Sequence, residues 1–341
     1  MKKGQPIKIG LMGVGVVAGY GHIPAIQRNK NLQLYSIFEP DAGRLIEAKA
    51  KYNVAHGFND LNLFFKSGID AVVITSPAPT HYQNVMLASS YKKPVLCEKP
   101  LAMNDAESER MIEAMKTAGV PLFVGFTYRF APNAREIHKL IKDGAIGQPR
   151  SLRLIYLWDC HGASNPRDNP NSPNLHRKGR MDEGGPMVDC GVHQIDLARW
   201  WLGSEVKRHQ GVGVWVDGHD APDHVYLHMD HENGAHTMVE MSYSYAHTSK
   251  ETRCEFVYEL IGTDGLIRYD RQARVFELVN KHGTQHKEWV YEKNFDGMYE
   301  EFDRALRTGK PGDMPTGEDG LIATRLAQSA TQEAMKSRKP G

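Results

Sequence analysis

The sequence predicts an α/β protein with a doubly wound parallel sheet in its first third and an antiparallel sheet after it. Apolar and amphipathic runs alternate through the first third, which is the βαβ pattern. One apolar run, IDAVVITSP, is continuous and β-branched, as expected of a parallel strand buried on both faces. After about residue 130, several runs alternate apolar and polar residues, and Asn233-Gly234 joins two of them. Asn-Gly between such runs is a strong hairpin signal.

The elements of the first third follow in order along the chain. IKIGLMG predicts a strand, residues 18–28 a helix, LQLYSIFE a second strand and AGRLIEAKAKYN an amphipathic helix. IDAVVITSP is followed by a helix over residues 80–90, the short strand in KPVLCEKP, a helix over residues 105–118 and the strand VPLFVGF.

The second part of the chain is read in the same way. RSLRLIYLWD, the two runs of DHVYLHMDHENGAHTMVEMSYSY, CEFVYELIG, GLIRYD and RVFELVN are predicted strands. Pro186 and Gly203 bracket a predicted helix in DEGGPMVDCGVHQIDLARWWLG, with Trp200 and Trp201 in its core-facing part. Residues 165–179 are rich in Pro, Asn and charge and predict a long, lid-like loop.

Composition excludes several functional classes. The 341 residues suffice for two domains, and the dispersed charges, with a net charge of +1, give no basic face for nucleic acid. No run approaches the roughly 20 apolar residues that cross a bilayer, and the N-terminus has no signal-peptide core. The four cysteines, Cys97, Cys160, Cys190 and Cys254, form no CxxC pair. We therefore expect free thiols in the cytoplasm, with no metal knuckle.

A dinucleotide site is predicted where the first strand turns into the first helix. Gly13, Gly15 and Ala18 fit G-x-G-x-x-G/A, in which the glycines allow a tight turn and close approach of a pyrophosphate. Any tight βα turn can use glycine, so the turn alone is weak. Glu39 ends the second strand, where a carboxylate accepts hydrogen bonds from the adenosine ribose and repels a 2′-phosphate. The combination favours NAD over NADP, although Glu39 could also be an ordinary loop carboxylate.

A second polar group follows the IDAVVITSP strand. Ligands of open α/β sheets bind outside the carboxyl ends of the strands, so Ser76, Pro77 and His81 are candidates to line the cofactor channel. The alternative is that Thr80 caps the next helix and His81 is a surface residue.

Two further charged groups are candidates for chemistry. Glu98 and Lys99 follow a short apolar strand, where unpaired charges are costly to bury unless they face a ligand crevice. Asp189 and His193 are four residues apart on the predicted helix, which suits a carboxylate that orients an imidazole general base. A solvated Asp–His pair is the plainer alternative.

In these motifs the chain resembles the Gfo/Idh/MocA family, the relatives of glucose–fructose oxidoreductase and inositol dehydrogenase. The glycine turn, SPAPTHY, CEKPLA, VGFTYRFAP, GGPMVDCGVHQIDLARWWLG and YEEFDRALRTGKPGDMPTGEDGLIATRLAQSA occur in family order over almost the whole chain. EKP followed about ninety residues later by D-x-x-x-H is the distinctive pair. One departure is that Ala18 replaces the third glycine, and His22 lies as though the turn held an extra residue.

The resemblance implies a Rossmann domain over residues 1–128 and an α+β domain over residues 129–341 with a large, mostly antiparallel open sheet. That sheet commonly mediates oligomerisation in the family, which implies a homodimer or homotetramer. The closing helix, near residues 320–335, would pack with the compact body. The implied reaction transfers a hydride between a secondary hydroxyl of a sugar or cyclitol and NAD, with no nucleic-acid or membrane partner.

Residue roles are carried over by position. Lys99 would hydrogen-bond the reacting oxygen, His193 would take its proton, and Asp189 would bind a neighbouring hydroxyl. The Lys99–Pro100 peptide is often cis in the family. The implied cofactor-binding residues are Gly13, Gly15, Val16, Val17, Ala18, Glu39, Ser76, Pro77, His81, Glu98, Lys99 and Arg129. The implied substrate-binding residues are Lys99, Tyr128, Trp158, Arg180, Asp189 and His193, with His161 as a further flanking candidate.

Other interpretations remain open from the sequence. Some relatives cleave glycosides by transient oxidation with retained NAD, and others are non-catalytic NAD-binding regulators. Arg129 could form an interdomain ion pair instead of contacting the cofactor. The histidines around the predicted hairpin are interpreted as a polar sheet face rather than a metal site: His219, His224, His228, His231 and His236.

Overall fold

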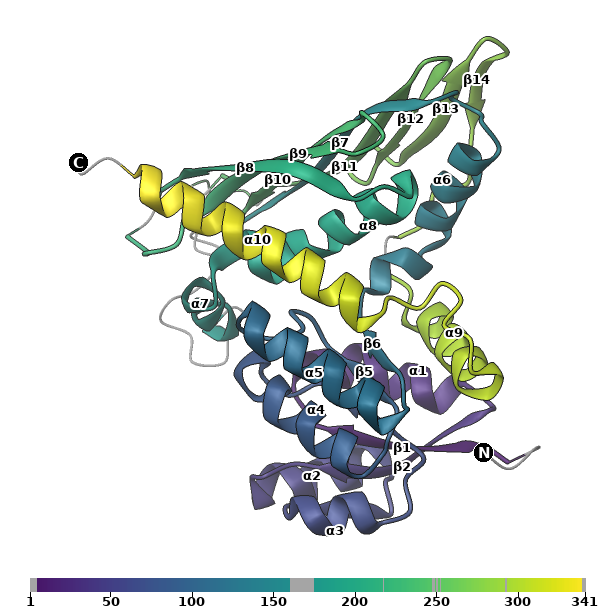
Figure 1. Ribbon diagram of the computed structural model, residues 1–341, viewed down its shortest axis with the longest axis vertical. Coiled ribbons are helices and arrows are strands. Elements are labelled where there is room, and N and C mark those ends of the chain that lie inside the picture. Colours follow the sequence, from purple (N-terminus) through teal and green to yellow (C-terminus); the bar gives the residue numbers. More distant parts are fainter. Residues whose placement is uncertain are drawn as a thin grey trace. The chain divides into compact units, whose positions relative to one another are not determined.

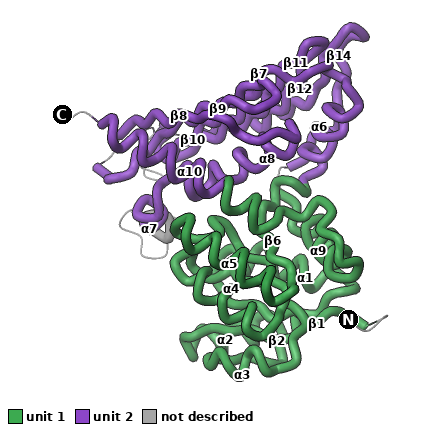
Figure 2. Tube along the Cα trace, in the orientation of Figure 1, with its two compact units in different colours: residues 1–130, 293–322 green, residues 131–292, 323–341 purple. Residues whose placement is uncertain are grey.

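The computed structural model describes residues 5–159, 175–216, 218–246, 249, 251, 253–291 and 293–338 (Figure 1). The chain forms two compact units (Figure 2). Unit 1 comprises residues 1–130 and 293–322, and unit 2 comprises residues 131–292 and 323–341. A segment from the last fifth of the chain therefore returns to the N-terminal unit.

Unit 1 is built on a six-stranded sheet in which every neighbouring pair is parallel. Its strands in spatial order are β3 (His56–Phe58), β2 (Leu32–Phe38), β1 (Ile7–Met12), β4 (Ala71–Ile74), β5 (Val95–Cys97) and β6 (Leu122–Val124). The predicted doubly wound parallel sheet is confirmed. The order reverses between β1 and β4, and ligands of such sheets bind at that point, outside the carboxyl ends of the strands.

Helices α2, α3 and α5 of unit 1, whose bounds are given below, begin at side-chain caps. Asp41, Asp60 and Asn104 each accept a backbone N–H of the first helical turn, which satisfies a donor that the helix itself cannot. The helices are α1 (Ile23–Arg28), α2 (Ala42–Tyr52), α3 (Leu61–Lys66), α4 (His81–Ser90) and α5 (Asp105–Ala118). β3 and α3 were not predicted from the sequence, because each is too short to show a clear periodicity of apolar residues.

The predicted helix over residues 18–28 is not a regular α-helix. Its first five residues, Ala18–His22, form a π turn, and α1 follows. A π turn accommodates one residue more than an α turn, so it absorbs the extra residue before His22.

Helix α9 (Phe295–Thr308) completes unit 1. Met298, Tyr299 and Phe302 of this helix are buried in one hydrophobic cluster with β1 and α1, and α9 packs directly against α1. This helix was not predicted from the sequence, although its buried residues recur at a helical spacing.

Unit 2 contains an eight-stranded sheet, and the predicted antiparallel sheet is confirmed. Its strands in spatial order are β14 (Gly283–His286), β13 (Val275–Asn280), β12 (Gly265–Asp270), β11 (Cys254–Gly262), β7 (Pro149–Trp158), β10 (His236–Ser242), β9 (His224–His231) and β8 (Val206–Val214). Only the β10–β7 pair is parallel. The β9–β10 hairpin turns at Asn233-Gly234 as predicted, with Gly234 at φ 84°.

Unit 2 also contains helices, and the one over Val192–Leu202 contacts β7 and β10 of the sheet. The helices are α6 (Pro132–Lys142), α7 (Leu175–Asp182), a π turn at Met187–Gly191, α8 (Val192–Leu202) and the later part of α10 (Gly317–Ser337). Trp201 is buried, and its Nε1 donates to the Ala134 carbonyl at 3.0 Å. Because α7 begins at residue 175, the predicted loop is wrong over residues 175–179, while residues 165–174 and His161 lie outside the described residues.

Candidate active site

The glycine turn of unit 1 has the geometry that close ligand approach requires. Gly13 has φ +91°, and a Cβ there would lie 2.8 Å from the Ser76 Cα, so only glycine fits. Apart from Gly15 itself and its chain neighbours, no atom of the described residues lies within 4 Å of the position that a Cβ on Gly15 would take. Val16 is exposed beside it, Val17 precedes the π turn and Ala18 is buried. The turn therefore offers its backbone to a ligand at the switch point of the sheet, which fits a dinucleotide pyrophosphate.

Glu39 closes the neighbouring strand end against the same turn. Its carboxylate is buried, and Oε2 accepts from Val14 N at 3.4 Å and from the Arg44 guanidinium at 3.1 Å. Oε1 accepts from Asp41 N at 3.3 Å. Glu39 is therefore an anchored carboxylate at the glycine turn rather than an ordinary loop residue.

Glu98 lies at the carboxyl end of β5 and belongs to a buried chain of hydrogen bonds. His22 Nε2 lies 2.8 Å from Glu98 Oε1, and His22 Nδ1 lies 2.7 Å from the Tyr299 hydroxyl. Burial raises the pKa of Tyr299 well above its usual value, and the charge of Glu98 adds to this effect. The tyrosine therefore stays protonated, and the His22 imidazole bridges its hydroxyl to the Glu98 carboxylate. Nε2 is the donor of the bond to Glu98, because an ionised carboxylate only accepts.

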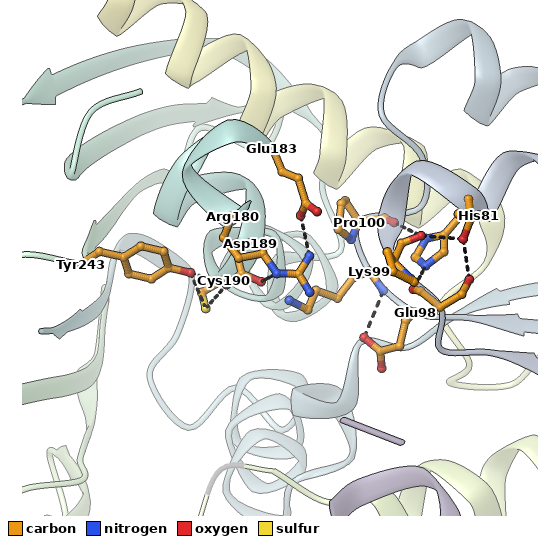
Figure 3. A network of polar contacts seen from close by, with 12 residues as sticks. His81, Glu98, Lys99, Pro100, Arg180, Glu183, Asp189, Cys190 and Tyr243 are labelled. Atoms are coloured by element: carbon orange, nitrogen blue, oxygen red, sulfur yellow. Dashed lines mark hydrogen bonds and ion pairs between the residues drawn. The ribbon is translucent and has the colours of Figure 1, made fainter. Parts of the chain in front are cut away.

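Lys99 and Pro100 follow Glu98, and the peptide between them is cis, as the resemblance suggested. The Lys99 backbone N–H donates to Glu98 Oε2 at 3.2 Å (Figure 3). His81 is buried next to this segment, and its ring nitrogens lie 2.9 Å from the carbonyl oxygens of Pro100 and Ser76. His81 is thus not a surface residue, and it ties the end of β4 to the end of β5.

The residues before α4 hold one another in place. Thr80 Oγ1 donates to the Pro77 carbonyl at 2.7 Å, and Ser76 Oγ lies 2.7 Å from Thr80 Oγ1. Asn84 Nδ2 donates to Ser76 Oγ at 3.0 Å. The Thr80 side chain makes no capping bond to α4, so it orders the Ser76–Pro77 turn instead of capping the helix.

Tyr128 and Arg129 lie on a buried 3₁₀ turn, Thr127–Phe130, after β6. Arg129 forms an ion pair with Asp319 at 3.4 Å, and both residues belong to unit 1. The Arg129 ion pair with Asp319 therefore lies within one unit.

In unit 2, Asp189 lies inside the π turn Met187–Gly191, so the predicted single α-helix is interrupted at its start. The Tyr243 hydroxyl donates to Asp189 Oδ2 (Figure 3). Arg180 Nε lies 3.8 Å from Asp189 Oδ1, and Arg180 also pairs with Glu183 at 2.5 Å. The Cys190 thiol lies 3.7 Å from Asp189 Oδ2. Asp189 is thus a buried, ligated carboxylate rather than a solvated one.

His193 follows on the first turn of α8 and is also buried. Trp158 ends β7, and its ring meets the Tyr243 ring edge-on with centroids 5.3 Å apart. The structure of unit 2 therefore brings Trp158, Arg180 and Asp189 together around Tyr243, a residue that the sequence analysis did not single out. The signal for Tyr243 was weak, because it is one of several tyrosines after the hairpin.

The histidines of the hairpin have protein partners. His224 pairs with Glu240 at 3.0 Å, and His236 pairs with Asp230 at 2.7 Å. His228 Nδ1 lies 3.2 Å from His236 Nε2, and His231 Nε2 lies 2.9 Å from the Thr237 hydroxyl. No group of three His, Cys, Asp or Glu residues suited to a metal occurs within the described part of the chain.

Within the described residues, every helix is too short or too polar to span a membrane.

Comparisons with known proteins find dehydrogenases that are similar to this chain over most of its length. Residues 7–126 match the model of an oxidoreductase family with an NAD-binding Rossmann fold, and residues 134–268 match the GFO/IDH/MocA C-terminal domain. Myo-inositol 2-dehydrogenase of Thermotoga maritima is 30% identical and covers 97% of both chains. Scyllo-inositol 2-dehydrogenase (NAD(+)) of Bacillus subtilis is 26% identical over 76% of this chain and 73% of its own. A crystal structure of a probable dehydrogenase from Thermotoga maritima superposes with a TM-score of 0.80 at 28% identity, covering 97% of this chain and 98% of that one.

Proposed function

The chain belongs to the Gfo/Idh/MocA family of NAD-binding oxidoreductases acting on CH–OH groups, and from this premise we propose that its substrate is a cyclitol or a sugar. The single observation that carries the proposal is the 30% identity to a myo-inositol 2-dehydrogenase over 97% of both chains. The polar residues of the candidate site suit a substrate rich in hydroxyl groups. The reacting group is a secondary hydroxyl, whose carbon loses a hydride.

The residues of the chain supply binding and proton transfer in this proposal. NAD, when bound, accepts the hydride, and the glycine turn with Glu39 holds its pyrophosphate and adenosine ribose. His193 takes the hydroxyl proton, because a histidine with a reference pKa of about 6.5 suits a general base near neutral pH. Lys99 donates to the same oxygen and stabilises its developing negative charge. Asp189, held by Tyr243 and Arg180, accepts from a neighbouring hydroxyl.

The remaining residues position these groups. The contacts of Glu98 with His22 and of His81 with the Ser76 and Pro100 carbonyls support a positioning role at the ends of β4 and β5. Ser76, Pro77 and Arg129 are assigned to the cofactor, and Tyr128, Trp158 and Arg180 to the substrate. The alternatives of glycoside cleavage and of a non-catalytic regulator receive no support from the three similar proteins named above, each of which is named as a dehydrogenase or probable dehydrogenase.

A substrate panel tests the proposal. Purified protein is incubated with NAD and, separately, with inositol isomers, aldoses, ketoses and glycosides, and NADH formation is followed by its absorbance. We expect turnover with at least one cyclitol or free sugar. Glycoside cleavage without net NADH, or NADH binding without any turnover across the panel, would reject the assignment.

We further propose that a second copy of this chain binds the open face of the eight-stranded sheet. Val212 and Val214 on β8 and Ile261 on β11 are each more than 40% exposed, which favours burial in an assembly. Light scattering should give a dimer or tetramer, and Val212→Asp should shift the oligomeric state toward the monomer.

The three described cysteines, Cys97, Cys190 and Cys254, are free thiols, which supports a cytoplasmic location.

A further inference from the structure

Two aromatic residues of α9 contact the buried imidazole of His22. Phe295 and Tyr299 are four residues apart, so their side chains lie on one face of the helix. The centroid of the His22 ring lies 5.1 Å from that of Phe295 and 5.8 Å from that of Tyr299, and both contacts are edge-on. The packing is close, because a Cβ on Gly21 would lie 2.4 Å from the Phe295 ring. Helix α9 therefore fixes the plane of the His22 ring.

A chain of polar contacts leads from α9 to Lys99. The Tyr299 hydroxyl lies 2.7 Å from His22 Nδ1, and His22 Nε2 donates to Glu98 Oε1 at 2.8 Å. Glu98 Oε2 accepts from the Lys99 backbone N–H at 3.2 Å. Gly125 leaves room for the carboxylate, because a Cβ there would lie 2.8 Å from Glu98 Oε1. Three contacts thus connect the Tyr299 hydroxyl with the backbone of Lys99.

Stability alone does not account for this buried polar chain. His22 and Tyr299 are fully buried, and the Glu98 side chain is 9% exposed. Replacing both partners of a buried hydrogen bond by apolar groups of the same shape is often neutral or stabilising. What the hydrogen bonds add is direction, because each one tolerates only a narrow range of geometry. A fixed direction has a use here, since Lys99 at the end of the chain is the residue assigned to the reacting oxygen.

We propose that Tyr299 is a positioning residue: it orients Lys99 through His22 and Glu98, and so brings a helix from the last fifth of the chain into the reaction. The inference rests on the proposed function, in which Lys99 donates to the reacting oxygen. Misplacing a reacting group by about 1 Å can lower a rate by about 10²-fold, so a slack chain of contacts slows turnover. The effect falls on the chemical step rather than on cofactor binding, because the fully buried Tyr299 does not itself touch a ligand.

The test removes one hydroxyl with Tyr299→Phe and measures steady-state kinetics on the substrate found by the panel. We expect kcat to fall about 10-fold, with the substrate KM and the NADH dissociation constant from calorimetry changed by less than about 2-fold. Tyr269→Phe is the matched control. It removes the hydroxyl of another buried tyrosine, which donates to the Val290 carbonyl at 2.8 Å in unit 2, and should leave kcat unchanged.

A double-mutant cycle separates positioning from a general defect of structure. In a Lys99→Met background no ammonium is left to orient, so adding Tyr299→Phe should change the residual kcat by less than about 2-fold. A general defect of structure would lower kcat by the same factor with and without Lys99.

Two substitutions of His22 identify the contact that carries the effect. A glutamine amide can take the place of Nε2 and donate to Glu98, whereas the shorter asparagine reaches only the place of Nδ1. His22→Gln should therefore keep kcat within about 3-fold, and His22→Asn should lower it by about 10-fold or more. This pair of variants serves as the test if Tyr299→Phe does not fold, as judged by thermal melting.

Several results would overturn the inference. They are an unchanged kcat in Tyr299→Phe, equal losses with and without Lys99, an equal loss in the Tyr269 control, and a similar loss in both His22 variants. Absence of turnover in the unchanged protein would instead reject the proposed function, and this inference with it.

Discussion

Each unit buries a carboxylate in its candidate site, and the two are held in different ways. In unit 1, the Glu98 carboxylate accepts from His22 Nε2, and the other ring nitrogen of His22 lies 2.7 Å from the Tyr299 hydroxyl. In unit 2, Asp189 lies beside Arg180, a guanidinium that stays charged, and accepts from Tyr243. The hydrogen bonds of Glu98 tie β5 to distant segments of unit 1, so this carboxylate has a structural role. Arg180 places a permanent positive charge beside Asp189, the residue that we assign to the substrate.

The largest expected effects come from Lys99 and His193, the two residues proposed to act on the reacting oxygen. Lys99→Met and His193→Asn should each lower kcat by about 10²–10⁴, the range for lost general acid–base catalysis. Steady-state kinetics on the substrate found by the panel measures the change. Lys139→Met, which removes an exposed ion pair with Asp143, is the matched control and should leave kcat unchanged. Full activity of both site variants would refute their assignment and leave the two carboxylates as purely structural groups.

Stability should separate the two carboxylates themselves. Glu98→Gln keeps an oxygen that accepts from His22 Nε2–H, so the free energy of unfolding should fall by only about 0.5–1.5 kcal/mol. Asp189→Asn removes the negative charge that accepts from the Tyr243 hydroxyl and lies beside Arg180. Its cost should be about 1.5–3 kcal/mol, as for hydrogen bonds to charged groups. Urea unfolding measures the free energy of unfolding of both variants. The m-values should stay unchanged, so that the two free energies can be compared directly. A larger loss in Glu98→Gln than in Asp189→Asn would contradict this ranking.

The smallest expected effect is a difference in acid sensitivity between two buried histidines, one in each unit. Burial lowers the pKa of His81 and of His231, while the carbonyls of Ser76 and Pro100 at His81, and that of Ser204 at His231, act in the opposite direction. The unfolded chain then binds more protons than the folded one below the usual histidine pKa of about 6.5. Stability should therefore fall as the pH drops below about 6.5 and stay constant above it.

The two histidines should contribute unequally to this loss. Neutral His231 can donate to the Ser204 carbonyl and accept from the Thr237 hydroxyl, whereas His81 faces two carbonyls and can donate to only one. Protonation therefore gives His81 a second hydrogen bond but gives His231 none. His231→Gln should flatten the unfolding free energy between pH 7 and pH 5 more than His81→Gln does, as measured by chemical unfolding. The reverse order would mean that the carbonyl contacts of His81 do not hold in solution.

The sequence predicted much of the fold because the signals involved are local. Period-two and continuous apolar runs identified most strands, the Asn233-Gly234 turn located the hairpin, and the helix over residues 105–118 is observed as α5 (Asp105–Ala118). The glycine turn was readable because the positive φ at Gly13 requires glycine, so the residue type marks the conformation. The π turn at Met187–Gly191 was not, since the sequence around Asp189 is equally compatible with a regular α-helix.

The residue types in the candidate site, and the parallel order of the first sheet, were thus determined by the sequence itself. The partners of those residues were decided only by the tertiary structure. Glu98 meets His22 across 76 residues, His22 meets Tyr299 across 277, and Asp189 meets Tyr243 across 54. No periodicity reports such pairs, because they form when distant segments pack and bury polar groups that must then find one another.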